Sequence, residues 1–303
     1  MPDDADYRVA PERPIENTSM GTLFIVSTPI GHMGDMTFRA VETLKSVSLV
    51  LCEDTRHSRR LLDHYGVTTH TASLHEHNEA RESPRIVSRM LAGSEVALIS
   101  DAGTPLLSDP GARLVDATIA AGVRVIPIPG ASALLSALVG AGLSTDVFTF
   151  VGFLARKGKE RTVQLAMLSA LPHTSVLYEA PNRVSDTLQQ LAEMVGATRR
   201  AAVARELSKH FEEFRRGTVG ELADVYRDTP PRGEVVIVME GRGPDTLDEA
   251  AMLETARALR LTGASARDIT QSLVEQHGVA RNLAYRLAQD AQDARNAPNA
   301  QDA

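Results

Sequence analysis

The sequence is poor in the side chains that hold metal clusters, disulfides and stacked bases. Its single cysteine, Cys52, cannot form an internal disulfide or contribute to a multi-cysteine metal site. Tryptophan is absent and aromatic residues are 4% of the chain, so the stacking platforms typical of single-stranded RNA binders are not expected to dominate. No apolar run approaches the roughly 18 residues that a membrane-spanning helix needs. The sequence therefore predicts no metal centre and no membrane contact.

Positive charge is also scarce. The chain has 32 Lys and Arg residues against 39 Asp and Glu residues, a net charge of -7, which argues against a protein wrapped broadly in nucleic acid. A local basic patch remains compatible with this balance. Residues 1–20 carry acids and prolines but no apolar core of a signal peptide, so we expect a cytoplasmic protein. We expect disordered tails at 1–20 and 292–303.

The length of 303 residues predicts two domains with a small appendage. From Gly21, apolar runs alternate with amphipathic helical stretches, the pattern of a parallel sheet wound with helices. The predicted strands of this first α/β domain, residues 21–143, are 22–27, 47–52, 95–100 and 123–128. Each ends in a loop rich in Gly, Pro or acid, at the edge where open α/β sheets bind ligands.

The helices of this domain show apolar positions at helical spacing, which predicts the faces that turn inward. Thr37 or Asp35 can cap the first helix, and Asp109 with Pro110 is expected to start a later one. The side chains expected to face the core are Phe38, Val41, Leu44, Leu114, Val115, Ile119, Leu135, Leu138 and Val139.

The second α/β domain is predicted at residues 144–242, with strands at 147–153, 174–178, 201–204, 211–218 and 234–240. The third and fourth of these are too close for a helical crossover, so this sheet is expected to be mixed, with antiparallel pairs. Residues 241–245 are interpreted as a linker. A small helical domain follows at 246–291, where Ser265 and Asp268 resemble a capping box.

The strand-end loops lack the two commonest phosphate cradles, G-x-G-x-x-G and G-x-x-x-x-G-K-[ST]. The loops at 100–105 and 129–133 combine Gly, Pro and small side chains, which lets the backbone approach a ligand. For any single loop a tight turn is the simpler interpretation. Several such loops at one edge favour a pocket, and a zwitterionic or cationic small molecule would suit it.

An ordered series of motifs carries a family resemblance over residues 21–242. The series is Thr28-Pro-Ile-Gly31, Glu53-Asp-Thr-Arg56, Leu74-His-Glu-His-Asn-Glu79, Ser100-Asp-Ala-Gly-Thr-Pro105, Pro129-Gly130, Tyr178-Glu179, Ala204-Arg-Glu206 and Gly233-Glu234. The chain resembles the tetrapyrrole methylase superfamily, and within it the members that methylate a cytidine 2'-hydroxyl in the decoding centre of 16S rRNA. It departs from the family at His32-Met33, where Asn-Leu is usual, and at Ser27, where Pro is common.

The resemblance implies a class III methyltransferase fold, with a cleft for S-adenosyl-L-methionine between two α/β domains. It also implies a homodimer whose substrate is 16S rRNA or the small ribosomal subunit. The cofactor contacts that it implies, mostly through backbone, are Ile30, Ala102, Gly103, Thr104, Leu107, Ser132, Ala133, Glu179 and Leu207.

Methyl transfer to a ribose hydroxyl needs alignment, and a general base or a cation near the oxygen would help. Asp54 is the first candidate base and Arg56 the candidate electrostatic contact, although a helix cap and a surface ion pair explain them equally well. Asp101 is a second candidate base, for which a side chain bonded to its own turn is the simpler interpretation.

Positive charge gathers at residues 156–161, at Arg59-Arg60 and at Arg215-Arg216. In the first of these clusters Arg156, Lys157, Lys159 and Arg161 are candidate RNA phosphate contacts. A solvated face is the alternative. His75 and His77 are more simply a hydrogen-bonded loop than metal ligands, and Cys52 is expected in the core.

Two other functions remain open. A superfamily enzyme acting on a small molecule such as a tetrapyrrole would lack RNA activity, and the basic segment together with the extra C-terminal helices argues against it. A non-catalytic nucleic-acid-binding regulator would act through the helical tail, whose glycines Gly263 and Gly278 faintly resemble a helix-turn-helix; a plain helical cap is the simpler explanation.

Overall fold

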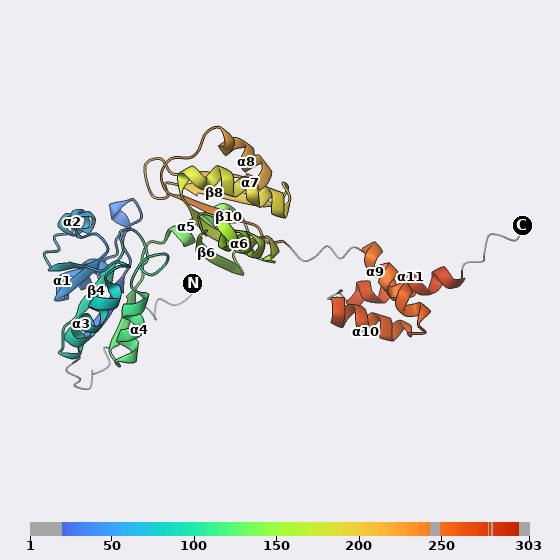
Figure 1. Ribbon diagram of the computed structural model, residues 1–303, viewed down its shortest axis with the longest axis horizontal. Helices are drawn as coiled ribbons and strands as arrows, with labels where there is room; N and C mark the ends of the chain where they lie inside the picture. Colours follow the sequence, from blue (N-terminus) through green and yellow to red (C-terminus); the bar gives the residue numbers. More distant parts are fainter. Residues whose placement is uncertain (1–19, 243–248, 278, 280, 297–303) are drawn as a thin grey trace, which may run out of the picture. The chain divides into compact units, whose positions relative to one another are not determined.

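The computed structural model describes residues 20–242, 249–277, 279 and 281–296. The described chain forms two compact units: one holds both sheets, within 20–169 and 174–240, and the other holds the C-terminal helices. Figure 1 labels many of the helices and strands of these units. No helix in the described part of the chain is long and apolar enough to cross a membrane.

The first sheet is fully parallel, in the order β3-β2-β4-β1-β5. Its strands are β1 (Thr22–Val26), β2 (Leu49–Cys52), β3 (Thr71–Ser73), β4 (Val96–Ile99) and β5 (Arg124–Ile128). Four were predicted; β3 was missed because three small, mostly polar residues at a sheet edge carry no apolar signal. The accompanying helices are the 3₁₀ turn η1 (Met33–Asp35), α1 (Phe38–Ser46), α2 (Thr55–His64), α3 (Glu79–Leu91), α4 (Ala112–Ala120) and α5 (Ala133–Ala141).

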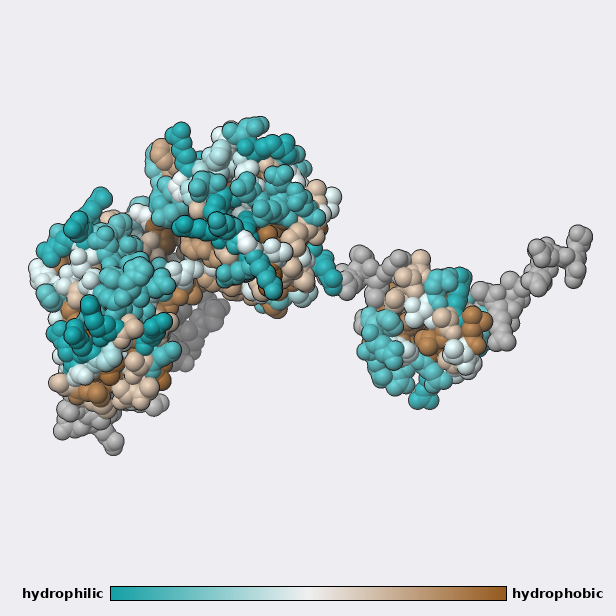
Figure 2. Space-filling view, in the orientation of Figure 1, coloured by the Kyte–Doolittle hydropathy of each residue, from teal (hydrophilic) through white to brown (hydrophobic). Residues whose placement is uncertain are grey.

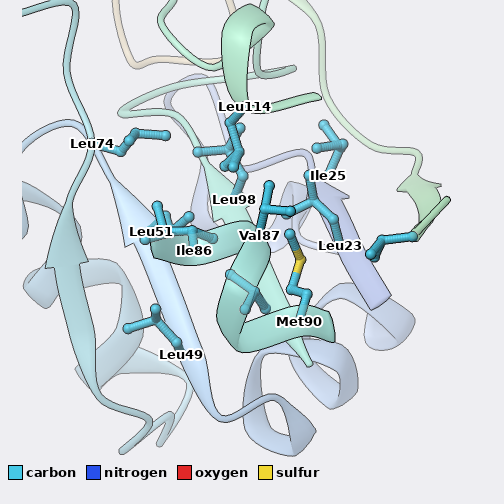
Figure 3. Close-up of a cluster of buried hydrophobic side chains, with 12 residues drawn as sticks. Leu23, Ile25, Leu49, Leu51, Leu74, Ile86, Val87, Met90, Leu98 and Leu114 are labelled. Atoms are coloured by element: carbon cyan, nitrogen blue, oxygen red, sulfur yellow. The ribbon is translucent and has the colours of Figure 1, made fainter. Parts of the chain in front are cut away.

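Helices cover both faces of this sheet, so its central strands are buried throughout. Every residue of β2 and β4 is buried, as expected for doubly covered parallel strands. One core cluster joins the sheet to α3 and α4, and Figure 3 shows Leu51, Leu98, Val87 and Met90 within it. Cys52 belongs to the cluster on the opposite face, where burial raises the pKa of its thiol. Its predicted place in the core is confirmed.

Several predicted inward side chains face solvent instead. Phe38 is 92% exposed and Ile119 is 61% exposed, whereas Leu44 and Leu114 are fully buried. The other buried residues of α1 and α4 are Ala40, Thr43 and Thr118. These residues are small or polar, so the spacing of large apolar residues does not reveal them. Leu135 and Val139 are likewise exposed on α5, where Leu138 is buried.

The start of α4 also differs from the prediction. Gly111, not Asp109, is the residue before the helix, and it provides no side-chain cap. The cap comes from α3: Glu79 Oε1 accepts hydrogen bonds from the amides of Arg113 (2.8 Å) and Leu114 (3.2 Å). Glu79 is 6% exposed, so this carboxylate is a buried bond between two helices. The last residue of the 74–79 motif thus holds α3 to α4.

The second sheet is mixed, in the order β6-β7-β10-β8-β9. β6 pairs with β7 in parallel and the other pairs are antiparallel, as predicted. Its strands are β6 (Phe148–Phe153), β7 (Thr174–Glu179), β8 (Arg200–Arg205), β9 (Glu213–Thr218) and β10 (Val235–Met239), and its helices are α6 (Gly158–Ala170), η2 (Pro181–Arg183), α7 (Val184–Val195) and α8 (Val219–Arg227). Helix α5 packs on this sheet, with Leu138 and Ile30 in the shared cluster.

The C-terminal unit contains α9 (Glu249–Leu261), α10 (Ala266–His277) and α11 (Arg281–Asn296) around its own apolar cluster. The capping box before α10 is confirmed: the Asp268 amide donates to Ser265 Oγ, and Asp268 Oδ2 accepts from the Ser265 amide. Helix α11 continues past Ala291, so residues 292–296 are helical where a tail was predicted. The rest of the predicted C-terminal tail, residues 1–19 of the N-terminal tail and residues 243–245 of the linker lie outside the described residues.

The Glu79 cap predicts a stability effect. Glu79→Ala leaves two buried amides at the start of α4 without an acceptor, and should lower the free energy of unfolding by about 2 kcal/mol. Glu79→Gln, which keeps an acceptor oxygen, should lose clearly less. Urea unfolding measures both, with Glu82→Ala as the control, since the half-buried Glu82 pairs with Arg81 and Arg85 of its own helix. Equal stability of the Glu79→Ala and Glu82→Ala variants would contradict the cap.

Candidate functional site

Three strand-end loops of the first sheet are tied together by hydrogen bonds. The amide of Thr28, after β1, donates to the Gly103 carbonyl (2.9 Å), and the Gly103 amide, after β4, donates to the Thr28 carbonyl (3.1 Å). The Thr28 hydroxyl donates to the Ser100 carbonyl (3.2 Å), and Ser100 Oγ donates to the Gly103 carbonyl (3.1 Å). The loops at 28–31 and 101–105 are therefore held side by side, as the strand order predicts.

The loop after β5 joins through side chains. Ser27 Oγ donates to Thr104 Oγ1 (3.2 Å), which donates to the Ala131 carbonyl (3.1 Å). A Cβ added at Gly130 would lie only 2.9 Å from Ser27 Cβ. The absence of a side chain at Gly130 therefore lets the loop after β5 approach the end of β1 closely. Ser27, one of the departures from the family pattern, thus bonds one loop to the next.

A hollow of about 440 Å³ opens beside these loops; we call it the acidic hollow. It carries the carboxylates of Asp101, Asp109 and Glu234, and no described residue in its lining is Lys, Arg or His. Small and apolar residues form most of the remaining wall. Residues of the second sheet close it, including Phe153, Tyr178, Ala180, Val235 and Val236.

The backbone of the acidic hollow is held in conformations that side chains rarely adopt. Gly103 has φ +83°, and a Cβ there would lie 3.1 Å from Ile30 Cγ2. Leu106 and Ser108, which follow in the same loop, also have positive φ, at 74° and 71°. Such strain concentrates at ligand sites, where the surrounding structure must hold it. Glycine at 103 lets the main chain itself form the wall.

Two carboxylates here differ from ordinary surface acids. Burial, with the nearby charges of Glu53 and Asp101, raises the pKa of Asp109 to about 6. Asp101 Oδ1 is buried and has no hydrogen-bond partner among the described residues. An unpartnered buried acceptor is costly, so it marks a place where a ligand donor would be favourable.

Glu179 contributes to the acidic hollow differently. Its carboxylate is fully buried, accepting from Thr187 Oγ1 (2.6 Å) and the Ala180 amide (2.9 Å) and pairing with Arg183 (3.2 Å). With these partners satisfied, the side chain is structural.

A second hollow of about 230 Å³ shares Ile30, Asp101, Ala102 and Glu234 with the first; we call it the basic hollow. It adds three basic side chains, His57, Arg60 and Lys209. Burial alone would lower the pKa of Lys209, but hydrogen bonds and charge from Glu206 (2.9 Å) and Glu234 (3.3 Å) outweigh it and raise the pKa. Lys209 therefore stays charged at the boundary.

Most of the predicted cofactor residues meet in the acidic hollow: Ile30, Ala102, Gly103, Thr104, Leu107, Ala133 and Glu179 line it. Two do not. Ser132 caps α5 by accepting from the Leu135 amide (3.5 Å), and Leu207 lies in the core cluster beneath.

Of the predicted catalytic residues, only Asp101 lines the hollows. Asp54 caps α2, accepting from the Arg56 (2.8 Å) and His57 (3.4 Å) amides, which lower the pKa of its carboxyl. Arg56 is exposed and does not line either hollow. The alternative interpretation of Asp54 as a helix cap is confirmed, while any catalytic role stays a prediction.

The predicted RNA-binding segment is divided by the fold. Arg156, Lys157 and Lys159 are exposed. Arg161 is 7% exposed, and its guanidinium donates to Gln190 (2.9 Å), Thr187 (2.8 Å) and the Ala155 carbonyl (3.1 Å). Arg161 thus joins α6 to α7, and the other three basic side chains form the accessible surface.

Sequence reasoning missed Asp109, His57 and Lys209, and noted Arg60 only as part of the basic pair Arg59-Arg60. Asp109 was interpreted as a helix start, although it follows the Gly103 loop by only a few residues. Lys209 follows the Arg205-Glu206 motif, and its link to Glu234 needs the tertiary fold. Among the described residues no group of three or more His, Cys, Asp or Glu side chains is arranged to hold a metal.

Comparisons with known proteins agree with this geometry. Residues 22–223 match the family model described as Tetrapyrrole (Corrin/Porphyrin) Methylases. Proteins named Ribosomal RNA small subunit methyltransferase I are similar: that of Synechocystis sp. is 42% identical, covering 89% of this chain and 98% of its own, and that of Pseudomonas aeruginosa is 45% identical, covering 89% and 97%.

Among solved structures, uroporphyrin-III C-methyl transferase from Thermus thermophilus, complexed with S-adenyl homocysteine, superposes with a TM-score of 0.54 at 18% identity, over 73% of this chain and 98% of that one. This likeness shows the predicted fold. The chain belongs to the tetrapyrrole methylase family and, within it, to the group of relatives named ribosomal RNA small subunit methyltransferase I.

Proposed function

We propose that this chain is an S-adenosyl-L-methionine-dependent methyltransferase that methylates the ribose 2'-hydroxyl of a cytidine in the decoding centre of 16S rRNA. The names of its relatives support a ribosomal RNA substrate. The identity of the methyl donor and that of the acceptor oxygen are inferred from the chemistry of the two hollows.

One observation carries the proposal: two hollows share a wall, and acids are the only charged groups among the described residues that line one, whereas the other also has basic side chains. The acidic hollow suits a cationic donor, because a sulfonium and an ammonium are stabilised by Asp101, Asp109 and Glu234. The basic hollow suits a polyanionic acceptor, because His57, Arg60 and Lys209 can face phosphate and ribose. Asp101 lies at the boundary, where donor and acceptor would meet.

The acidic hollow fits the cofactor on grounds of shape as well as charge. Its volume of about 440 Å³ is in the range of small-molecule sites. The 102–104 backbone and Ala133 would hold it by close main-chain contact, since Gly103 leaves room that a Cβ would take up. A cofactor bound there would supply an electrophilic methyl group on a sulfonium sulfur. Because the leaving group is a neutral thioether, the transfer needs no acid from the protein.

The chain's own task is then to position and activate the hydroxyl. Asp101 Oδ1, buried and unpartnered, can accept a hydrogen bond from a ribose hydroxyl and take its proton as the oxygen attacks. Lys209 is charged and partly buried in the same hollow, where it can stabilise negative charge on that oxygen or an adjacent phosphate. Closure by the second sheet would exclude water from both reactants.

Mass-spectrometric mapping of 2'-O-methyl groups tests the proposed function. The full chain should methylate one cytidine in 16S rRNA or in the small subunit, and should leave a uroporphyrinogen substrate unmodified. Methylation of the tetrapyrrole with none on rRNA would overturn the proposal in favour of a small-molecule enzyme.

We also propose a homodimer formed through the exposed face of α5. Leu135 and Val139 lie one helical turn apart and are 50% and 74% exposed, and Val147 and Phe148, shortly after along the chain, are also exposed. Exposed apolar side chains of this size are typical of an interface.

The catalytic role of Asp101 predicts a loss of rate. Asp101→Asn removes the acceptor of the proton and should slow single-turnover methyl transfer by about 100-fold or more. RNA affinity should change little. Asp54→Asn is the matched variant, since Asn also caps helices well. A larger loss of rate in Asp54→Asn than in Asp101→Asn would assign the base to Asp54 instead.

The raised pKa of Asp109 predicts a pH dependence. The ionised carboxylate attracts a cation, so affinity for S-adenosyl-L-methionine should rise as the pH increases through about 6. The same ionisation costs folding free energy, because the folded state holds the proton up to about 6 and the unfolded state only to about 3.8. Asp109→Asn should therefore flatten the calorimetric affinity profile and raise stability above pH 6. An unaltered affinity profile would contradict the role of Asp109.

The proposed dimer predicts a change in assembly. Val139→Asp places a charge on the apolar face of α5 and should shift the protein to monomers in sedimentation velocity. Val163→Asp, at an exposed position of α6, is the control and should remain dimeric. A monomeric wild-type chain, or a Val139→Asp variant that dimerises normally, would contradict this interface.

A further inference from the structure

A third hollow, separate from the two already described, lies between β8, β9 and the end of α8. It measures about 490 Å³, and we call it the arginine pocket after Arg205, Arg215 and Arg232 in its wall. Glu213, Tyr226 and the consecutive prolines Pro230 and Pro231 line it as well. The surface over α7 and α8 is predominantly hydrophilic in the view of Figure 2.

The charges in the arginine pocket do not balance. Glu213 pairs with two of the arginines, at 2.5 Å to Arg205 and 3.0 Å to Arg215, and these contacts lower the pKa of its carboxyl. Arg232 is exposed and forms no ion pair with a described residue. The nearby Asp224 on α8 is bound to Arg227. Three guanidinium groups therefore face one carboxylate, which leaves an excess of positive charge.

Tyr226 adds a second, independent observation. The residue is 5% exposed, and its hydroxyl is buried with no hydrogen-bond partner among the described residues. Arg215 lies over its ring, 5.8 Å from the centroid. Burial raises the pKa of Tyr226, so the hydroxyl keeps its proton and is available as a donor. A buried donor without an acceptor beside unbalanced arginines is the arrangement that an anion would complete.

We propose that the arginine pocket binds a phosphodiester group of the RNA substrate, away from the methylated nucleotide. Guanidinium groups recognise phosphate by paired hydrogen bonds, and the Tyr226 hydroxyl supplies a further donor. The pocket is connected to the methyl-transfer site: Arg205 pairs in register with Val235, which lines the acidic hollow, and precedes Glu206, which holds Lys209. The inference rests on the proposed function for its ligand.

The sharpest test uses the single-atom change Tyr226→Phe. Removing an unpartnered buried hydroxyl should leave the melting temperature unchanged or higher. The same change should weaken binding of a single-stranded oligoribonucleotide from 16S rRNA by about tenfold, the loss of one hydrogen bond to a charged group. A lower melting temperature together with unchanged RNA affinity would show a structural hydroxyl and overturn the proposal.

The arginines are tested by salt dependence. In the full chain, Arg232→Ala should reduce the slope of log Kd against log salt by about 0.7, the value for one lost phosphate contact on a single strand. Arg227→Ala removes the same charge from the end of α8, outside the pocket, and should leave that slope unchanged. Equal effects of the two variants would mean general attraction only, and would contradict a specific site.

Two further measurements separate the possible failures. Affinity for S-adenosyl-L-methionine should be the same in Tyr226→Phe and Arg232→Ala as in the wild type, because neither residue lines the acidic hollow. Inorganic phosphate should compete with the oligoribonucleotide only weakly; strong competition that mapped to Tyr226 would assign the pocket to a free anion instead. Wild-type chain that binds the oligoribonucleotide at the arginine pocket but methylates no rRNA would count against the proposed function alone.

Discussion

The reciprocal hydrogen bonds between Thr28 and Gly103 are the constraint on which the site depends. They join the loops after β1 and β4, and the Ser27–Thr104–Ala131 chain of hydrogen bonds extends the connection to the loop after β5. Glycine at 103 is required because the backbone there has positive φ and approaches Ile30 closely. The main chain of 102–104 is thereby presented to the acidic hollow as a rigid wall.

Charge is divided across this wall in a way that suits a cationic donor and an anionic acceptor. The protein carries a net charge of -7, yet basic side chains line two of its hollows: His57, Arg60 and Lys209 lie in the one beside Asp101, and three arginines line the arginine pocket. Electrostatic attraction to phosphate therefore does not need a basic protein overall. It needs only a few basic side chains whose charge exceeds that of the carboxylates beside them, as in the arginine pocket.

The parallel first sheet and the meeting of three loops at one of its edges could be predicted, because apolar runs and glycine-rich strand ends follow directly from burial and backbone geometry. The order of the strands could not be predicted, and the short strand β3 was missed. The inward faces of α1 and α4 could not be predicted. The small residues Ala40, Thr43 and Thr118 are buried there, whereas the large apolar residues Phe38 and Ile119 face solvent. The partners of individual side chains could not be predicted from the sequence either. Arg161 is basic in sequence yet buried against Glu179, and Glu79 caps a helix that begins more than thirty residues later.

The most direct test of this account is a crystal structure of the full chain with S-adenosylhomocysteine and a short 16S rRNA fragment containing the substrate cytidine. We expect the thioether sulfur of S-adenosylhomocysteine in the acidic hollow, against the backbone of residues 102–104. We expect the cytidine 2'-oxygen within hydrogen-bond distance of Asp101. S-adenosylhomocysteine bound elsewhere would contradict this mechanism. A cytidine 2'-oxygen placed against Asp54, with Asp101 turned away from it, would also contradict it.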